Sequence, residues 1–158
     1  MPRITPNLWF VTEALQAAEL YTSIFPNSRI TELNRYPEGS GEQTGKVLTV
    51  TFELDGQEYT ALNGGPQVGF NEAISMLISC EDQDEVDYYW ARLLEGGGQE
   101  QRMGWLKDRF GLSWQVVPSG MEELLASLDP EASVRAMEAM TGMKKLDMRV
   151  LMAAAATT

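Results

Sequence analysis

The pattern of apolar and polar residues divides the first part of the chain into short strands and one amphipathic helix. Residues 4–11 form an apolar run that contains Pro6, which predicts a strand at the edge or start of a sheet. Thr12 is the expected N-cap of a helix that ends before Pro26, because proline disfavours helix in the residue before it. The apolar face of this helix repeats at helical spacing and comprises Ala14, Ala17, Ala18, Tyr21, Ile24 and Phe25.

The following residues predict a polar loop and a β-hairpin. Asp55-Gly56 is a strong signal for a type I′ turn, which needs positive φ at both central positions. A two-residue loop places Phe52 opposite Tyr59 and Leu48 opposite Asn63. Asn63 then lies on the apolar side of the hairpin, where its amide needs partners from protein, water or ligand. The predicted elements are strands at 28–36, 47–54 and 57–63, with a loop at 37–45.

After a loop at residues 63–66, the same order of elements begins again. A helix starting at Glu81 or Asp82 buries Val86, Tyr89, Trp90 and Leu93 and ends at Gly96-Gly97-Gly98. Short strands are expected at 73–79, 99–103, 105–107 and 112–117, and helices at 121–128, 131–140 and 146–156. We therefore predict one compact domain with a first module at 1–66, a second module at 67–119 and a helical tail at 120–158.

Charge and composition narrow the classes of function. The chain has 12 basic and 23 acidic residues and a net charge of −11, which disfavours binding to nucleic acid or to an anionic membrane. Its apolar runs are shorter than the roughly 20 residues that span a bilayer. No basic segment followed by an apolar stretch opens the chain, so we expect a cytoplasmic protein.

Two residue counts exclude whole classes of chemistry. The sequence has no histidine, so a catalytic triad or a zinc site that needs imidazole cannot form. Cys80 is the single cysteine, so no internal disulfide or thiolate cluster is possible. Carboxylates, amides, hydroxyls, one thiol and aromatic walls remain as candidate functional groups.

Several segments together resemble a known family: Ile4–Phe10, Phe52–Gln57, Ala61–Pro66, Phe70–Ala73, Cys80–Gln83, Gly104–Asp108 and Phe110–Pro118, with a similar tail at 137–147. They are similar to the PhnB-like branch of the glyoxalase/bleomycin-resistance/dihydroxybiphenyl-dioxygenase superfamily, which has the vicinal oxygen chelate fold. Many members are labelled 3-demethylubiquinone-9 3-methyltransferase. The resemblance implies an α+β protein in which paired βαβββ modules form a cup-shaped mixed sheet, assembled as a homodimer.

The metal site of that superfamily is not predicted here. In metal-dependent members, His, Glu or Gln side chains on the first and last strands of each module hold a divalent ion. The resemblance places the histidine positions near residues 5–7 and near Asn71 or Ser75, and the glutamate position at Gln115. The remaining ligand falls on the Tyr59–Asn63 side of the first module. Without an anionic or imidazole ligand, an ion gains too little to offset its dehydration.

Methyl transfer is also not expected from the residues. A nucleotide-like methyl donor needs a glycine-rich turn that opens a helix. Gly64-Gly65 is followed by Pro66, and Gly96-Gly97-Gly98 ends a helix. The family name therefore does not by itself predict that this chain transfers methyl groups.

Several residues have both a structural and a functional interpretation. The acidic residues from 81 to 87 are typical of a helix N-terminus. Cys80 is interpreted as a buried, unreactive thiol. Methionines in the tail either pack against a neighbouring surface or form a groove for partners. Trp9, Trp105 and Trp114 either fill the core or wall a pocket. Asn63 and Gln115 contact either a ligand or backbone and water.

From these residues we predict a small-molecule-binding protein that needs no metal or other cofactor. The alternative is a metal-dependent lyase, isomerase or dioxygenase that uses Asn63 and Gln115, and methyl transfer is a third hypothesis. The expected partners are a small-molecule ligand and a second copy of the chain. The candidate pocket residues are Asn7, Trp9, Tyr59, Asn63, Trp105, Trp114 and Gln115.

Overall fold

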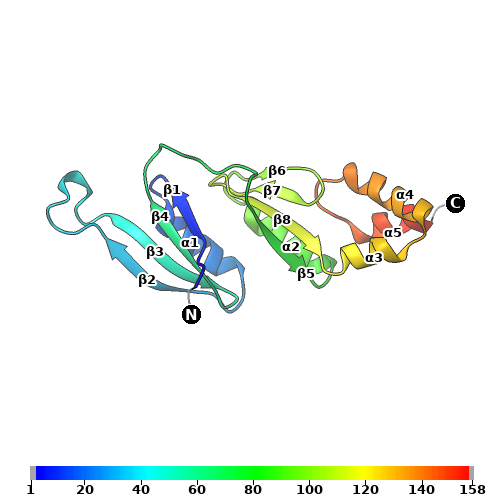
Figure 1. Cartoon of the computed structure of the whole chain (residues 1–158), viewed down its shortest axis with the longest axis horizontal. Coiled ribbons are helices and arrows are strands. Elements are labelled where there is room, and N and C mark those ends of the chain that lie inside the picture. The colour runs from blue at the N-terminus through cyan, green and yellow to red at the C-terminus, as the bar shows by residue number, and fades with distance from the viewer. Residues whose placement is uncertain (1–2, 157–158) are drawn as a thin grey trace. The chain divides into compact units, whose positions relative to one another are not determined.

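Each half of the chain folds as a strand, a helix and three further strands, as predicted (Figure 1). The computed structural model describes residues 3–156, and the boundary between its two compact units lies between Phe70 and Asn71. Each unit contains a four-stranded sheet with one parallel pair of strands and otherwise antiparallel pairs. The fold is the α+β glyoxalase/bleomycin-resistance type that the resemblance implied, with C-terminal helices added.

The first sheet has the strand order β1-β4-β3-β2. Asp55 and Gly56 have φ of 48° and 82°, as a type I′ turn requires. The register places Phe52 opposite Tyr59 and Val50 opposite Ala61, as the two-residue loop predicted. Its elements are β1 (Asn7–Phe10), α1 (Ala14–Ile24), β2 (Arg29–Arg35), η1 (Gly41–Gln43), β3 (Val47–Leu54) and β4 (Gln57–Asn63).

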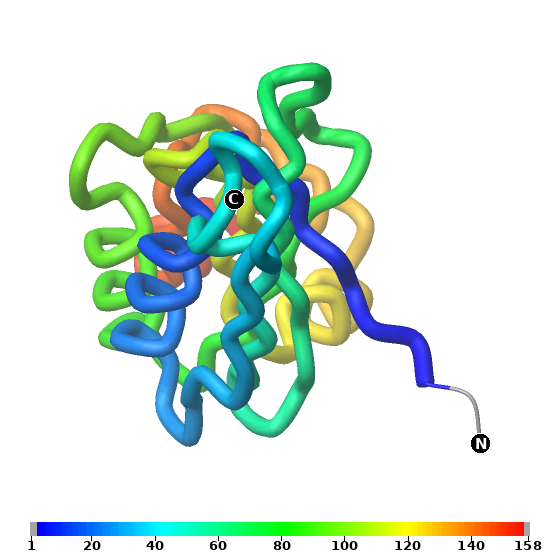
Figure 2. The backbone as a smooth tube through the Cα atoms, turned by 90° about the vertical axis from the view of Figure 1, so that its left-hand side faces the viewer, coloured from blue at the N-terminus to red at the C-terminus, as the bar shows by residue number. Residues whose placement is uncertain are grey.

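Helix α1 covers one face of the first sheet, and Figure 2 shows its blue turns to one side of the cyan strands. Its buried side chains are Ala14, Ala17, Ala18, Tyr21 and Ile24. They pack against side chains of the sheet, where the rings of Phe52 and Tyr59 stack with their centroids 5.5 Å apart. The predicted N-cap at Thr12 is wrong, because Glu13 occupies that position without a side-chain cap hydrogen bond. A residue from another strand supplies the missing acceptor, as described below.

The second sheet has the strand order β5-β8-β7-β6. Helix α2 begins after Asp82, whose side chain accepts a hydrogen bond from the backbone N–H of Glu85. The predicted buried face of Val86, Tyr89, Trp90 and Leu93 is confirmed. The elements are β5 (Ser75–Cys80), α2 (Gln83–Leu94), β6 (Gln99–Glu100), β7 (Trp105–Lys107) and β8 (Ser113–Pro118).

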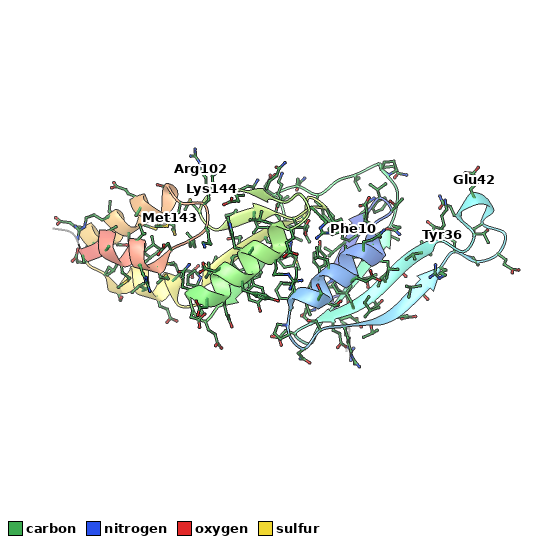
Figure 3. All side chains as sticks on the ribbon, turned by 180° about the vertical axis from the view of Figure 1, so that it is seen from behind. Phe10, Tyr36, Glu42, Arg102, Met143 and Lys144 are labelled. Atoms are coloured by element: carbon green, nitrogen blue, oxygen red, sulfur yellow. The ribbon has the colours of Figure 1, made fainter. Side chains whose placement is uncertain are left out.

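The helical tail is part of the second unit and is joined to it by hydrogen bonds. Met103 and Gly104 donate backbone N–H groups to the carbonyls of Met143 and Lys144, both at 2.8 Å. Figure 3 labels Met143 and Lys144 on this part of the tail, near Arg102. Leu146 is 1% exposed, and Met121, Met140, Met143 and Met148 lie in the cluster around it, so most tail methionines pack inward. The helices are α3 (Met121–Ser127), α4 (Pro130–Thr141) and α5 (Met148–Ala156).

Residues 3–156 contain no helix with the length and apolarity needed to span a bilayer.

Candidate functional site

The two faces of the first sheet have different environments. Successive side chains of a strand point to opposite faces, and β1 buries Leu8 and Phe10 while Asn7 and Trp9 are more exposed. Leu8 is paired with Ala61, so Ala61 and its neighbours at alternate positions lie on the α1 side. Asn7 and Trp9 therefore lie on the opposite face from α1, here called the open face because no helix within residues 3–70 packs on it. Tyr59 and Asn63 lie on the helix-covered face.

Trp9 is held against the loop that follows β4. Its indole N–H donates to the carbonyl of Gly65 at 2.9 Å. A Cβ atom at Gly64 would lie 2.4 Å from the indole ring, so an alanine there requires the ring or the backbone to move. Gly64 and Gly65, which predicted a loop in the sequence, thus lie against the half-buried indole of Trp9.

Asn63 connects three elements at one end of the first sheet. Its Oδ1 accepts the backbone N–H of Ala14 at 2.8 Å and so supplies the cap that α1 lacks locally. Its Nδ2 donates to the carbonyl of Val47 at 3.1 Å. The amide predicted as a ligand contact is therefore bonded to backbone groups of α1 and β3, and it fixes where these elements end.

A cleft of about 740 Å³ lies beside Asn63 in the first unit. It is bordered by the start of α1, the loop between β2 and β3, and residues 63–67. Tyr36 is the first residue after β2, and Glu42 lies farther along the loop between β2 and β3 (Figure 3). Asn63 is the one predicted site residue that lines this cleft. Its lining residues include Val11, Leu15, Glu19, Tyr36, Lys46, Val47 and Pro66.

The second sheet brings two predicted residues together on its open face. Gln115 is paired with Trp105 on one side and with Leu77 on the other. The Gln115 amide donates to the Ser75 hydroxyl at 2.9 Å. Leu77 is 63% exposed, so an apolar side chain stands beside this amide. This arrangement can recognise a small molecule by hydrogen bonds and apolar contact.

Two further features of this face arise from β7 and β8. Lys107 forms an ion pair with Glu72, and the hydrogen bond from its ammonium lowers the pKa of Glu72. Ser113 is paired with Lys107 and lies two residues from Gln115, on the same face. Within residues 3–156, the buried hydroxyl of Ser113 has no hydrogen-bond partner.

Trp114 lies on the opposite face of β8 from Gln115 and is 2% exposed. Its indole N–H donates to Oδ2 of Asp108 at 2.9 Å. Asp108 is itself 3% exposed and also accepts the backbone N–H groups of Phe110 and Leu112. Trp114 is therefore packed in the core beside a buried carboxylate, whereas Trp105 is half-buried on the open face.

Cys80 does not have the environment of a nucleophile. The thiol is buried, and its pKa is raised to about 11 by burial, with further contributions from Glu85 and Asp82. A thiol with that pKa is protonated at neutral pH, and the thiolate is the reactive form. The interpretation of Cys80 as a buried, unreactive thiol agrees with this geometry.

The carboxylates of the described chain are dispersed or already paired. Residues 3–156 contain no cluster of three His, Cys, Asp or Glu side chains arranged to hold a metal ion. In the acidic run from 81 to 87, Asp82 caps α2 and Asp87 pairs with Lys145 at 2.8 Å, and the hydrogen bond from Lys145 lowers the pKa of Asp87. This run is a helix N-terminus, as predicted.

Comparisons with known proteins connect this geometry to a family. Residues 2–117 match the family described as 3-demethylubiquinone-9 3-methyltransferase. The PhnB protein from Bacillus cereus is 31% identical with a TM-score of 0.68, covering 75% of this chain and 100% of that chain. Protein PA1353 from Pseudomonas aeruginosa is 18% identical with a TM-score of 0.60, and the match covers 72% of this chain and 95% of that chain.

A further similar structure is the fosfomycin resistance protein FosX from Listeria monocytogenes, complexed with Mn(II) and sulfate. It is 19% identical with a TM-score of 0.54, covering 78% of this chain and 97% of that chain. At these identities PA1353 and FosX show likeness of fold alone. A comparison with curated proteins gave no match.

Proposed function

The chain belongs to the 3-demethylubiquinone-9 3-methyltransferase family, within the vicinal oxygen chelate superfamily, and we propose that it binds a small molecule without a metal ion. The observation that carries this proposal is the set of neutral groups on the open face of the second sheet. Gln115 stands at the expected glutamate position and its amide is bonded to Ser75. The Ser113 hydroxyl is fully buried, so it is not available to a ligand. In this proposal the Gln115 amide and the Ser75 hydroxyl supply the hydrogen bonds to the ligand.

The residues at the expected metal positions do not fit a divalent ion. Asn7, Ser75 and Gln115 offer amide and hydroxyl oxygens, and none of them carries charge. Glu72, on the same unit as Gln115, is already paired with the ammonium of Lys107. Hard divalent cations need several anionic oxygen ligands to offset the loss of their water. A ligand on this face is therefore expected to be held by shape, amides and hydroxyls.

Metal retention tests this proposal directly. After incubation with Mg, Mn, Ni, Zn or Fe salts and exhaustive dialysis, the purified chain is expected to retain far less than one ion per chain, measured by mass spectrometry of the metals. Gln115→Ala is the matched variant and is expected to behave identically. Stoichiometric retention by the wild type that Gln115→Ala abolishes would contradict the proposal and support a metal-dependent lyase, isomerase or dioxygenase.

The family's methyltransferase description has little support in this geometry. A methyl donor of the adenosylmethionine type usually rests against a glycine-rich turn that opens a helix. Gly64 and Gly65 follow β4 and seat Trp9, while Gly96–Gly98 follow α2. Neither glycine group starts a helix. We therefore assign the family's fold to this chain and do not propose that it catalyses methyl transfer.

The proposal includes a homodimer in the cytoplasm. Exposed apolar side chains support self-association: Leu77 on the open face of β5 is 63% exposed, and Val150 on α5 is 50% exposed. Light scattering coupled to gel filtration at micromolar concentration is expected to give twice the 17.6 kDa mass of the chain. The monomer mass at that concentration would contradict the dimer. The free, buried thiol of Cys80 suits a reducing compartment.

A further inference from the structure

We propose that the cleft of the first unit is a second binding site, for a small apolar molecule that carries a single carboxylate. The cleft lies beside α1, whereas the open face proposed above carries Trp105 and Gln115 and belongs to the other unit. Its volume of about 740 Å³ is within the range of sites for small molecules. The two sites share no lining residue.

The walls of the cleft are fixed by backbone hydrogen bonds. Tyr36 and Lys46 close the base of the loop between β2 and β3, because the N–H of Tyr36 donates to the carbonyl of Lys46 at 2.9 Å and the N–H of Gly45 donates to the carbonyl of Tyr36 at 3.1 Å. The Asn63 amide ties α1 to the start of β3. A ligand therefore meets a preformed cleft and need not order it on binding.

Apolar side chains supply most of the contact surface for the body of a ligand. Val11 and Leu15 come from the start of α1 and the residues before it, and Val47 and Pro66 from the opposite wall. Val11 is 39% exposed, so it can bury further apolar surface when a ligand binds. These four aliphatic side chains favour an alkyl or aryl group for the part of the ligand that contacts them, while Thr12, Gln16, Gln43 and Gln67 also line the cleft with groups that can form hydrogen bonds.

The polar groups of the cleft define the charged end of the ligand. Within the described residues, the ammonium of Lys46 has neither an ion pair nor a hydrogen bond, in a chain of net charge −11. The Tyr36 hydroxyl donates to the carbonyl of Asn63 at 3.5 Å, a long hydrogen bond that a closer acceptor can replace. An ammonium and a phenol O–H among the residues that line one cleft favour a carboxylate.

Glu19 limits the charge that the cleft accepts. It is the single acidic residue among those that line the cleft, and Lys46 is the single basic one. A monocarboxylate pairs with Lys46, whereas a second negative charge would meet Glu19 without a further cation. This balance favours a monoanion over a phosphate ester or a dicarboxylate.

Titration with 4-phenylbutyrate, followed by backbone amide shifts, tests the assignment. We expect saturable shifts at Val47 and Gly64 in the wild type. Lys46→Gln is expected to weaken binding about fivefold, the effect of losing one partly exposed ion pair. The uncharged analogue 4-phenylbutyramide is expected to bind the wild type and Lys46→Gln equally.

Two matched variants make the result specific. Lys144→Gln removes another exposed ammonium that lines no part of the cleft, and it is expected to bind 4-phenylbutyrate as the wild type does. Gln115→Ala, which tests the open face, is expected to leave these shifts unchanged. The assignment is overturned if the wild type shows no saturable shifts at the cleft, or if Lys46→Gln and Lys144→Gln weaken binding equally.

Discussion

Replacing Asp108 with alanine is expected to lower the free energy of unfolding by about 4 kcal/mol, since the change removes the acceptor of three hydrogen bonds in the core. The carboxylate is 3% exposed and accepts from Phe110 N at 2.9 Å, Leu112 N at 3.1 Å and the Trp114 indole at 2.9 Å. A buried donor left unpaired costs about 1–3 kcal/mol, so the losses add to a large share of a typical domain's stability.

Urea unfolding followed by circular dichroism measures this loss. Asp108→Asn keeps an acceptor for the two backbone N–H groups but presents an N–H₂ group to the indole, so about half of the effect is expected. Asp84→Ala removes an exposed carboxylate of α2 and is expected to change the free energy by less than about 0.5 kcal/mol. An Asp108→Ala chain with the wild-type midpoint would show that these hydrogen bonds contribute no net stability.

The parts of the fold that followed from the sequence depend on local signals. Asp55-Gly56 fixes a hairpin because its backbone angles suit one turn type, and the register of β3 and β4 follows from a two-residue loop. Val86 and Trp90 mark the buried face of α2 because i and i+4 lie on the same side of a helix. Each of these features is encoded within a dozen residues.

The orientation of the tryptophans on the second sheet could not be predicted in this way. Trp105 and Trp114 occur on adjacent strands, yet they lie on opposite faces because Trp105 pairs with Gln115 and Leu106 with Trp114. That register depends on the turn at 108–111, whose conformation is set by the hydrogen bonds to Asp108. The five residues 108–112 between β7 and β8 permit several registers, so the sequence pattern does not determine the face of each indole.

The cleft of the first unit depends on segments that are distant in the sequence. Its lining comes from the start of α1, from the residues around Tyr36 and Lys46, and from the chain after β4. The sequence predicted a loop at 37–45 but gave no signal that this loop and α1 border one space. Hydrophobic periodicity describes the face of one element at a time, so a cleft between three elements lies beyond its range.

Asn63 shows the same limit for a single residue. Its place on the apolar side of the hairpin followed from the turn, and so did the need for hydrogen-bond partners. The partners themselves are the N–H of Ala14, 49 residues away, and the carbonyl of Val47. Thr12 was the local candidate for the cap, and tertiary structure supplied a different residue.

Asn63→Ala is expected to lower the free energy of unfolding by about 2 kcal/mol, because it removes a helix cap and leaves the part-buried carbonyl of Val47 without its donor. Asn63→Asp keeps an acceptor for Ala14 and loses the N–H₂ group, so a smaller loss is expected. Urea unfolding measures both variants against Asn34→Ala, which removes an exposed amide hydrogen bond of the same unit.

The comparison with Asn34→Ala separates a positioning role from a ligand contact. The amide of Asn34 bonds Thr49 at the surface, so its loss is expected to cost less than about 0.5 kcal/mol. If Asn63→Ala lost no more stability than Asn34→Ala, the two hydrogen bonds of Asn63 would not hold α1 to the sheet. Its amide would then be available to a ligand, as the sequence first suggested. A loss near the expected value instead makes Asn63 the residue that sets the end of α1 and one wall of the cleft.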